Sequence, residues 1–218
     1  MNEIELRKIL EHHIGDSLGK KGQVLYSGIE TLARGRFYFI GFNPAIDPSN
    51  RELRTIPLGN TNWSAYRDQC WTCGEWNACK PHGQKRHQKQ AIKIMAELGV
   101  AQPEKVFATN LVFEESAGID DVYALDRLHR YWAVHRHLLA EVRPEIIVCF
   151  GKQEPRSAFG YLCRVAQRHD PVRTGGGFKR FSGTFDLGHG QPLTAKVIGV
   201  RHPSYPSRVD GLREFAGV

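Results

Sequence analysis

The sequence predicts an α/β protein, a three-layer α/β/α fold with a central, mostly parallel sheet of four or five strands. Short apolar runs alternate with stretches of helical periodicity, which is the pattern of strands joined by helical crossovers. The apolar runs occupy residues 37–42, 105–111, 145–150 and 195–200. With 218 residues the chain is long enough for one well-packed domain and short for two, so we expect a single domain over residues 1–218.

The first half of the chain holds two of these strands. Apolar residues spaced three and four apart predict a helix over residues 4–18 before the strand at 37–42. Residues 44–64 are rich in Pro, Gly, Asn, Ser and Thr and are typical of a long loop, and loops of that length are commonly functional. A basic amphipathic helix over residues 84–98 then leads to the strand at 105–111.

The second half repeats the alternation and adds a hairpin. Its longest helical pattern ends at Pro144, and the strand that follows is closed by Gly151. The predicted elements are, in order, a helix over 123–142, a strand over 145–150, a helix over 152–168, a hairpin over 178–185 after a glycine-rich break, a strand over 195–200 and a short terminal helix.

The composition favours a protein that binds a polyanion such as nucleic acid. Lys and Arg number 30 against 23 Asp and Glu, which gives a formal net charge of +7. The first apolar segment is broken by charged residues and is no secretory signal, and no run approaches the roughly 20 apolar residues of a membrane span. Five cysteines, unevenly spread, do not suggest a disulfide framework. We therefore expect a cytoplasmic protein with no membrane partner.

Polar residues follow three of the apolar strands at the point where each strand ends. Because the carboxyl ends of parallel strands share one edge of a sheet, and ligands bind at that edge, we expect the side chains of Asn43, Asn110 and His202 to line one pocket. The three segments are Gly41-Phe42-Asn43-Pro44, Thr109-Asn110 and His202-Pro203-Ser204. Taken singly, each also fits an ordinary turn at the end of a strand.

Together with the loop Thr55-Ile56-Pro57-Leu58-Gly59, these segments occur in the order found in the uracil-DNA glycosylase superfamily. The first segment resembles the Gly-x-Asn-Pro motif of its single-strand-selective and mismatch-specific branches, and the likeness extends over residues 36–208. The resemblance implies a uracil-DNA glycosylase-like fold. It also implies a hydrolase of base excision repair that cleaves the N-glycosidic bond of uracil, or of a related damaged base, flipped out of DNA.

The chemistry requires a positioned water, a donor to the base oxygen and an amide that reads the base. Asn43 and His202 are the catalytic candidates, one to orient the water and the other to donate a hydrogen bond to the departing base. An amide cannot deprotonate the water, so Asn43→Asp is expected to keep or raise activity. The remaining substrate-binding candidates are Gly41, Phe42, Pro44, Leu58, Asn110 and Ser204.

Position 58 departs from the resembling branches. There an aromatic residue stacks on the flipped base, whereas here the residue is Leu58. Phe42, Trp63 and Tyr66 are nearby candidates to replace that stacking. The substitution leaves a second interpretation open, a non-catalytic nucleic-acid-binding module that keeps the glycosylase fold.

We expect DNA to be the partner and the protein to act as a monomer. The DNA-binding candidates are Lys85, Arg86 and Lys89, which would contact phosphates, and Tyr205 and Arg208, in a segment suited to enter the duplex as a base leaves it. A solvated helix face is the alternative interpretation of the basic residues on the helix, but their position beside a candidate site on a basic protein favours phosphate contact.

A cysteine cluster marks the region between the loop and the basic helix. Cys70, Cys73, Cys79 and His82 have a spacing that suits a structural zinc ion. An iron–sulfur cluster is less favoured, and without a metal these cysteines would be thiols in a loop. Catalysis of the expected kind requires no cofactor.

Overall fold

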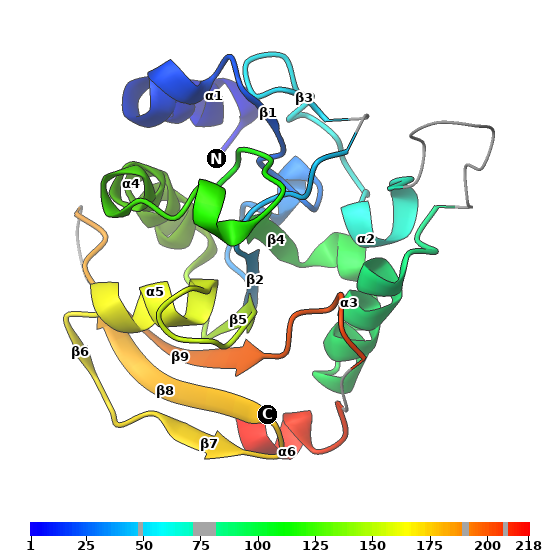
Figure 1. Ribbon diagram of the computed structural model, residues 1–218, viewed down its shortest axis with the longest axis vertical. Coiled ribbons are helices and arrows are strands. Elements are labelled where there is room, and N and C mark those ends of the chain that lie inside the picture. The colour runs from blue at the N-terminus through cyan, green and yellow to red at the C-terminus, as the bar shows by residue number, and fades with distance from the viewer. Residues whose placement is uncertain (48–49, 72–81, 189–191, 207–208) are drawn as a thin grey trace.

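The computed structural model describes residues 1–47, 50–71, 82–188, 192–206 and 209–218 (Figure 1). The helices are α1 (Glu3–Ile14), α2 (Ala65–Asp68), α3 (Arg86–Glu97), α4 (Leu125–Val142), α5 (Ala158–Val165) and α6 (Leu212–Ala216). The strands are β1 (Lys21–Gly22), β2 (Phe37–Gly41), β3 (Arg51–Glu52), β4 (Phe107–Asn110), β5 (Ile146–Phe150), β6 (Arg168–His169), β7 (Arg173–Gly175), β8 (Phe178–Phe185) and β9 (Leu193–Val200).

The predicted α/β class is confirmed. Four parallel neighbours, in the order β4-β2-β5-β9, form one part of the main sheet, with β4 at its edge. Strand β8 extends this sheet antiparallel to β9, and β6 and β7 both pair with β8. The main sheet therefore has seven strands in the described part of the chain, not four or five, because a long antiparallel strand and two short ones extend its edge.

The predicted hairpin at 178–185 is wrong in detail. Residues Phe178–Phe185 form one continuous strand, β8, which is joined to β7 by a turn at Gly176 and Gly177. Both glycines have positive φ angles, of 57° and 88°, which suits a tight turn between antiparallel strands. The glycine-rich break is thus the turn of the hairpin, and the apolar run after it is only the second arm.

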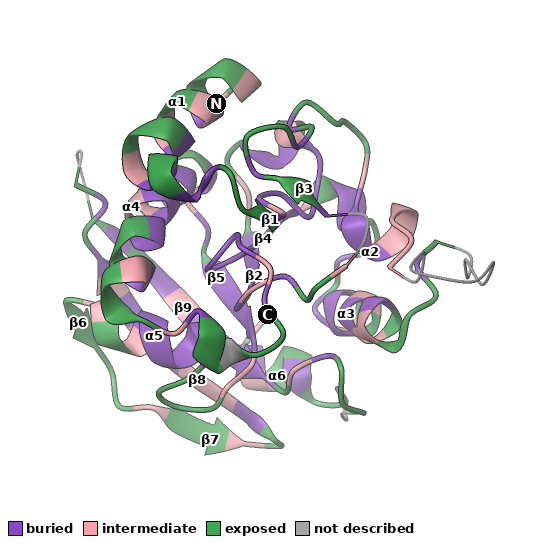
Figure 2. Cartoon of the chain, turned by 45° about the horizontal axis from the view of Figure 1, so that its top comes forward, coloured by how far each residue is buried: buried purple, intermediate pink, exposed green. Residues whose placement is uncertain are grey.

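Helices cover both faces of the sheet (Figure 1). Alternate side chains of β2 point to opposite faces, with Tyr38 and Ile40 in the core beneath α1, α4 and α5, and Phe37 and Phe39 in the core beneath α2, α3 and α6. Figure 2 shows the central strands almost wholly buried and α1 and α4 buried on one side only. None of the helices in the described ranges is long and apolar enough to cross a membrane.

A buried histidine of α4 fixes the end of β4. The Tyr38 hydroxyl donates to Nδ1 of His135 over 2.7 Å, and Nε2–H of His135 donates to the carbonyl of Leu111 over 3.0 Å. Both ring nitrogens are thus satisfied in the neutral form, and burial lowers the pKa of His135 to about 4. The segment that leaves β4 is held against the helix layer at this point.

Candidate functional site

A pocket of about 240 Å³ opens at the carboxyl ends of β2, β4 and β9. It holds six of the eight catalytic and substrate-binding candidates that the sequence predicts, and the side chains of Asn43, Asn110 and His202 share its wall. The six are Gly41, Asn43, Pro44, Asn110, His202 and Ser204. Segments that are about 160 residues apart in the chain therefore meet where the parallel strands end.

Asn110 is placed by a glycine on the neighbouring strand. Gly41 and Asn110 are register partners, and a Cβ atom added at position 41 would lie 1.9 Å from Oδ1 of Asn110. Only glycine leaves room for the amide at this point. A hydrogen bond joins the side chains of Asn110 and Tyr26, and burial keeps the pKa of that phenol above its ordinary value, so Tyr26 stays protonated.

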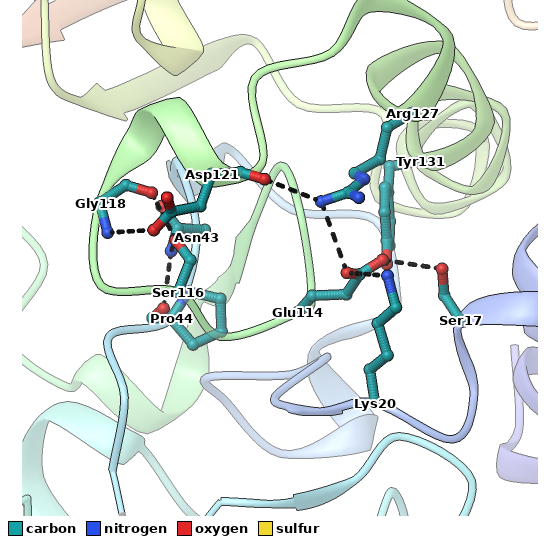
Figure 3. A network of polar contacts seen from close by, with 10 residues as sticks. All are labelled: Ser17, Lys20, Asn43, Pro44, Glu114, Ser116, Gly118, Asp121, Arg127 and Tyr131. Atoms are coloured by element: carbon teal, nitrogen blue, oxygen red, sulfur yellow. Dashed lines mark hydrogen bonds and ion pairs between the residues drawn. The ribbon is translucent and has the colours of Figure 1, made fainter.

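The amide of Asn43 is fixed through its nitrogen (Figure 3). Nδ2 donates to the carbonyl oxygen of Pro44 over 2.7 Å and to Oγ of Ser116 over 2.9 Å. The Ser116 hydroxyl in turn donates to the carbonyl of Gly118 over 2.6 Å. Because both amide hydrogens are occupied, Oδ1 is the atom of this side chain that is left to accept from a molecule in the pocket.

The loop that carries Ser116 is anchored by a buried carboxylate (Figure 3). Glu114 accepts hydrogen bonds from Ser17 and Tyr131, each over 2.7 Å, and from Lys20 over 2.8 Å. Burial alone would raise its pKa, but the hydrogen bonds from Lys20, Tyr131 and Ser17 outweigh burial and lower the pKa below its ordinary value. Glu114 is therefore a charged anchor for the loop next to Asn43.

His202 is held as a neutral hydrogen-bond donor. The backbone N–H of Ser204 donates to Nδ1 of His202 over 3.3 Å, so the ring proton of the neutral form lies on Nε2. Burial lowers the pKa of His202 below its ordinary value. At neutral pH the side chain can thus donate one hydrogen bond through Nε2–H without carrying a charge.

Aromatic rings form a further part of the pocket lining. The ring centroids of His87 and His202 lie 4.9 Å apart, and those of Trp71 and His87 lie 5.2 Å apart. Tyr66 stacks on His87 with an interplanar angle of 23° and contacts Tyr26 at 5.7 Å. Burial, and next the neighbouring His202, lower the pKa of His87 to about 3. We call Tyr26, Tyr66, Trp71 and His87 the ring wall.

Sequence reasoning found only part of the ring wall. Tyr66 was a candidate to replace the stacking aromatic, and it lines the pocket. His87, within the predicted basic helix, and Tyr26 and Trp71 are not among the residues that the sequence predicts for the site. The spacing along the helix could have identified His87. His87 lies one turn before Ala91, and Ala91 is buried in the core beneath α3.

Two nominated substrate-binding residues lie outside the pocket wall. Phe42 is 6% exposed and stacks on Tyr123 at 6.0 Å, on the same sheet face as Ile40, because strand side chains alternate with a period of two. Leu58 is 1% exposed and belongs to the same core. Its loop is tied to α1 by Arg7, which donates to the carbonyl oxygen of Ile56 over 2.8 Å. Both residues are structural in this fold.

One nominated DNA-binding residue lines the pocket. Lys85 lines it at the start of α3, and Arg86 and Lys89 are exposed on that helix. The side chain of Tyr205 is 57% exposed, and the guanidinium of Arg201 lies 5.2 Å from the centroid of its ring. Arg208 lies outside the described residues.

Half of the nominated metal site lies outside the described residues. Cys70 is half-buried and His82 is exposed, whereas Cys73 and Cys79 fall in the range 72–81. Within the described ranges, no three His, Cys, Asp or Glu side chains are grouped so that they could hold a metal ion. The zinc site stays a prediction.

No protein-family model matches the chain, and no curated protein has a significant match to its sequence. Fold and pocket together define an α/β protein with an amide- and imidazole-lined pocket at the carboxyl edge of its sheet. Function has to be inferred from this pocket.

Proposed function

We propose that this protein is a DNA glycosylase-like hydrolase that releases uracil, or a related damaged base, from a nucleotide flipped out of DNA. The observation that carries the proposal is the pocket that Asn43, Asn110 and His202 share with the ring wall. A flipped base needs a compact pocket that offers hydrogen bonds to its edge and apolar surface to its face. This pocket offers both.

Recognition of the base is assigned to Asn110 and the ring wall. An amide carries a donor and an acceptor, which match the O4 and N3–H groups on one edge of uracil. Gly41 and Tyr26 fix that amide from two sides. Tyr66 and Trp71 line the same pocket and supply the aromatic surface that Leu58, buried in the core, does not.

Bond cleavage is assigned to His202. As the bond between C1′ of the sugar and the base nitrogen breaks, its electron pair moves onto the base and charge builds on O2. The Nε2–H of neutral His202 donates to that oxygen, and a preorganised donor of this kind is worth about 10²–10³ in rate. The hydrogen bond from Ser204 to Nδ1 keeps the proton on the nitrogen that is needed.

Asn43 is assigned to the attacking water. Its Oδ1 accepts a hydrogen bond from the water, which adds to the cationic C1′ and then loses a proton to solvent or to the departing base. The geometry reverses the expectation for Asn43→Asp. A carboxylate in place of the amide would lose both donated hydrogen bonds and face the carbonyl oxygen of Pro44, so this variant should be slower than wild type.

DNA binding is assigned to the basic residues around the pocket. Lys85, Arg86 and Lys89 would contact phosphates, and Tyr205 would fill the gap that a flipped nucleotide leaves. The formal charge of +7 favours such contacts, and they should weaken as salt rises.

The test is base release from a single-stranded oligonucleotide with one uracil, detected as strand cleavage at the abasic site in alkali. His202→Ala should lower the single-turnover rate by about 10²–10³ while affinity for the oligonucleotide stays within about twofold. Asn43→Ala and Asn43→Asp should both be slower than wild type. Glu145→Ala, an exposed residue away from the pocket, is the matched control and should behave as wild type.

Three other results would count against the proposal. DNA binding without release of uracil, hypoxanthine or xanthine by the wild-type protein would favour the non-catalytic binding module. Release that survives His202→Ala unchanged would remove the assigned mechanism. Failure to bind DNA even at low salt would reject both functions.

A further inference from the structure

A second pocket, of about 220 Å³, adjoins the first. The two pockets share Gln23 and Asn50 in their walls, so one molecule could extend from one into the other. The remaining residues of its wall are Gly22, Leu25, Arg51, Ile56, Pro57, Asn60, Trp63 and Gln69. The roles assigned above use neither this pocket nor its amide side chains.

The amides in this wall are fixed in orientation. Gln23 donates through Nε2 to the carbonyl oxygen of Leu25 over 2.9 Å and to Oε1 of Gln69 over 3.1 Å. The Gln23 acceptor oxygen and the Gln69 amide donors are therefore the groups left for a ligand. Asn50 donates through Nδ2 to Ala45 and to Glu115, over 3.0 Å and 2.7 Å, which leaves its Oδ1 as an acceptor at the junction.

Flat apolar surface completes the second pocket. Trp63 is half-buried and packs partly against the core beneath α2 and α3, and its carbonyl oxygen accepts a hydrogen bond from the N–H of Gly28 over 2.9 Å. Pro57 and the cation Arg51 are exposed in the same wall. An aromatic face, fixed donors and acceptors, and a neighbouring cation suit a nucleobase attached to a phosphate.

We infer that the second pocket binds the nucleotide next to the flipped one, in a single-stranded substrate. The inference rests on the proposed function. A strand whose target base occupies the first pocket must leave it past a neighbouring wall, and the wall with Gln23 and Asn50 is the one that adjoins the second pocket. A neighbour that stays stacked in a duplex cannot enter this pocket, so the geometry favours single strands.

The test changes the substrate as well as the protein. Single-stranded oligonucleotides carry one uracil, and the nucleotide on its 5′ or its 3′ side is replaced by a baseless tetrahydrofuran residue. A matched oligonucleotide carries the same residue five positions away. Stacking of one base on an aromatic side chain is worth about tenfold or more in affinity. We expect kcat/KM of the wild-type protein to fall about tenfold for the baseless neighbour on one side, and to be unchanged by the distant one.

Variants tie this loss to the pocket. Trp63→Ala should lower kcat/KM on the intact strand by about tenfold and show no further loss with the baseless neighbour, whereas Trp63→Phe should keep the neighbour effect. Because the substrate change is made with wild-type protein, a fold defect in the Trp63 variants cannot mimic the result.

The outcomes separate the two proposals. Uracil release that is equal with intact and baseless neighbours on both sides would overturn the inference and leave the proposed function standing. A neighbour effect that persists in full in Trp63→Ala would place the contact elsewhere and overturn it too. No release from any strand would overturn both.

Discussion

The two walls of the first pocket are built by different interactions. Asn43 and Asn110, which we call the amide wall, are fixed by hydrogen bonds and by close steric fit, whereas the ring wall is held largely by contacts between its own rings. The amide wall sets the directions of donors and acceptors. Burial lowers the pKa of His87, in the ring wall, and of His202, whose ring contacts His87, so both imidazoles are neutral at neutral pH.

The two kinds of contact suit different chemical tasks in the proposed reaction. Directional hydrogen bonds are needed where a water and a base edge must be oriented to within a fraction of an ångström. A low-dielectric surface is needed where a neutral donor must meet developing negative charge, because a hydrogen bond is strongest there. Each wall supplies one of these conditions. Separate perturbations of the two walls should therefore have different signatures.

The largest expected effect comes from the charge that anchors the amide wall. Glu114→Ala removes the acceptor for Lys20, Tyr131 and Ser17, and each of the two buried hydroxyls that is left unpaired costs about 1–3 kcal/mol in the free energy of unfolding. Urea unfolding measures the loss. Base release should fall as well, because the loop that carries Ser116 loses its anchor.

An exposed ion pair is the matched control. In Arg36–Glu145 the carboxylate side chain is 73% exposed, and Glu145→Ala should cost no more than about 1 kcal/mol. If both variants lose the same small amount, the buried network around Glu114 is not what holds the amide wall.

The second-largest expected effect is a loss of stability as pH falls, caused by His87 in the ring wall. His87 has a native pKa of about 3, and the unfolded value is about 6.5, so the unfolded state binds a proton first as pH falls. The contribution of neutral His87 is complete above pH 6.5 and is lost as pH falls toward 3. Between pH 6.5 and 5 this loss is about 2 kcal/mol for one imidazole.

His135 titrates in the same direction, since its native pKa is about 4, and it adds a similar loss beneath the amide wall. Urea unfolding at several pH values therefore needs variants to separate the two. His87→Phe and His87→Gln should both flatten part of the pH dependence, and His135→Gln should flatten another part. If the free energy of unfolding falls with pH as steeply in all three variants as in the wild type, His87 and His135 are not buried in the neutral form.

The sequence predicted the amide wall and His202 better than the ring wall for a physical reason. Asn43, Asn110 and His202 each follow an apolar strand, and parallel strands bring their carboxyl ends together whatever the loops do. Tyr26 and Trp71 belong to irregular segments, whose positions depend on packing that no local periodicity encodes. The same holds for Leu58, whose burial follows from the docking of its loop onto α1.

The prediction that Phe42 lines the pocket failed for a different reason. The period of two along β2 already puts its side chain on the face of Tyr38 and Ile40, so strand alternation predicts a core residue there. The hairpin at the antiparallel edge of the sheet was also predicted only in part. Gly176 and Gly177 marked a turn, but which of the flanking segments formed the hairpin depended on pairing with β9.

The smallest expected effect tests the corrected place of Leu58. In the core, Leu58→Phe adds volume to a packed site and should cost about 1–3 kcal/mol in the free energy of unfolding, whereas Leu58→Met, which conserves volume, should cost less than about 1.5 kcal/mol. Neither variant should change kcat/KM for uracil release at a temperature where both are folded. An aromatic residue that reached the flipped base would instead add stacking and tighten binding of the base by about tenfold. If Leu58→Phe binds the base more tightly and loses little stability, then residue 58 contacts the flipped base. The ring wall would then supply less of the stacking than we propose.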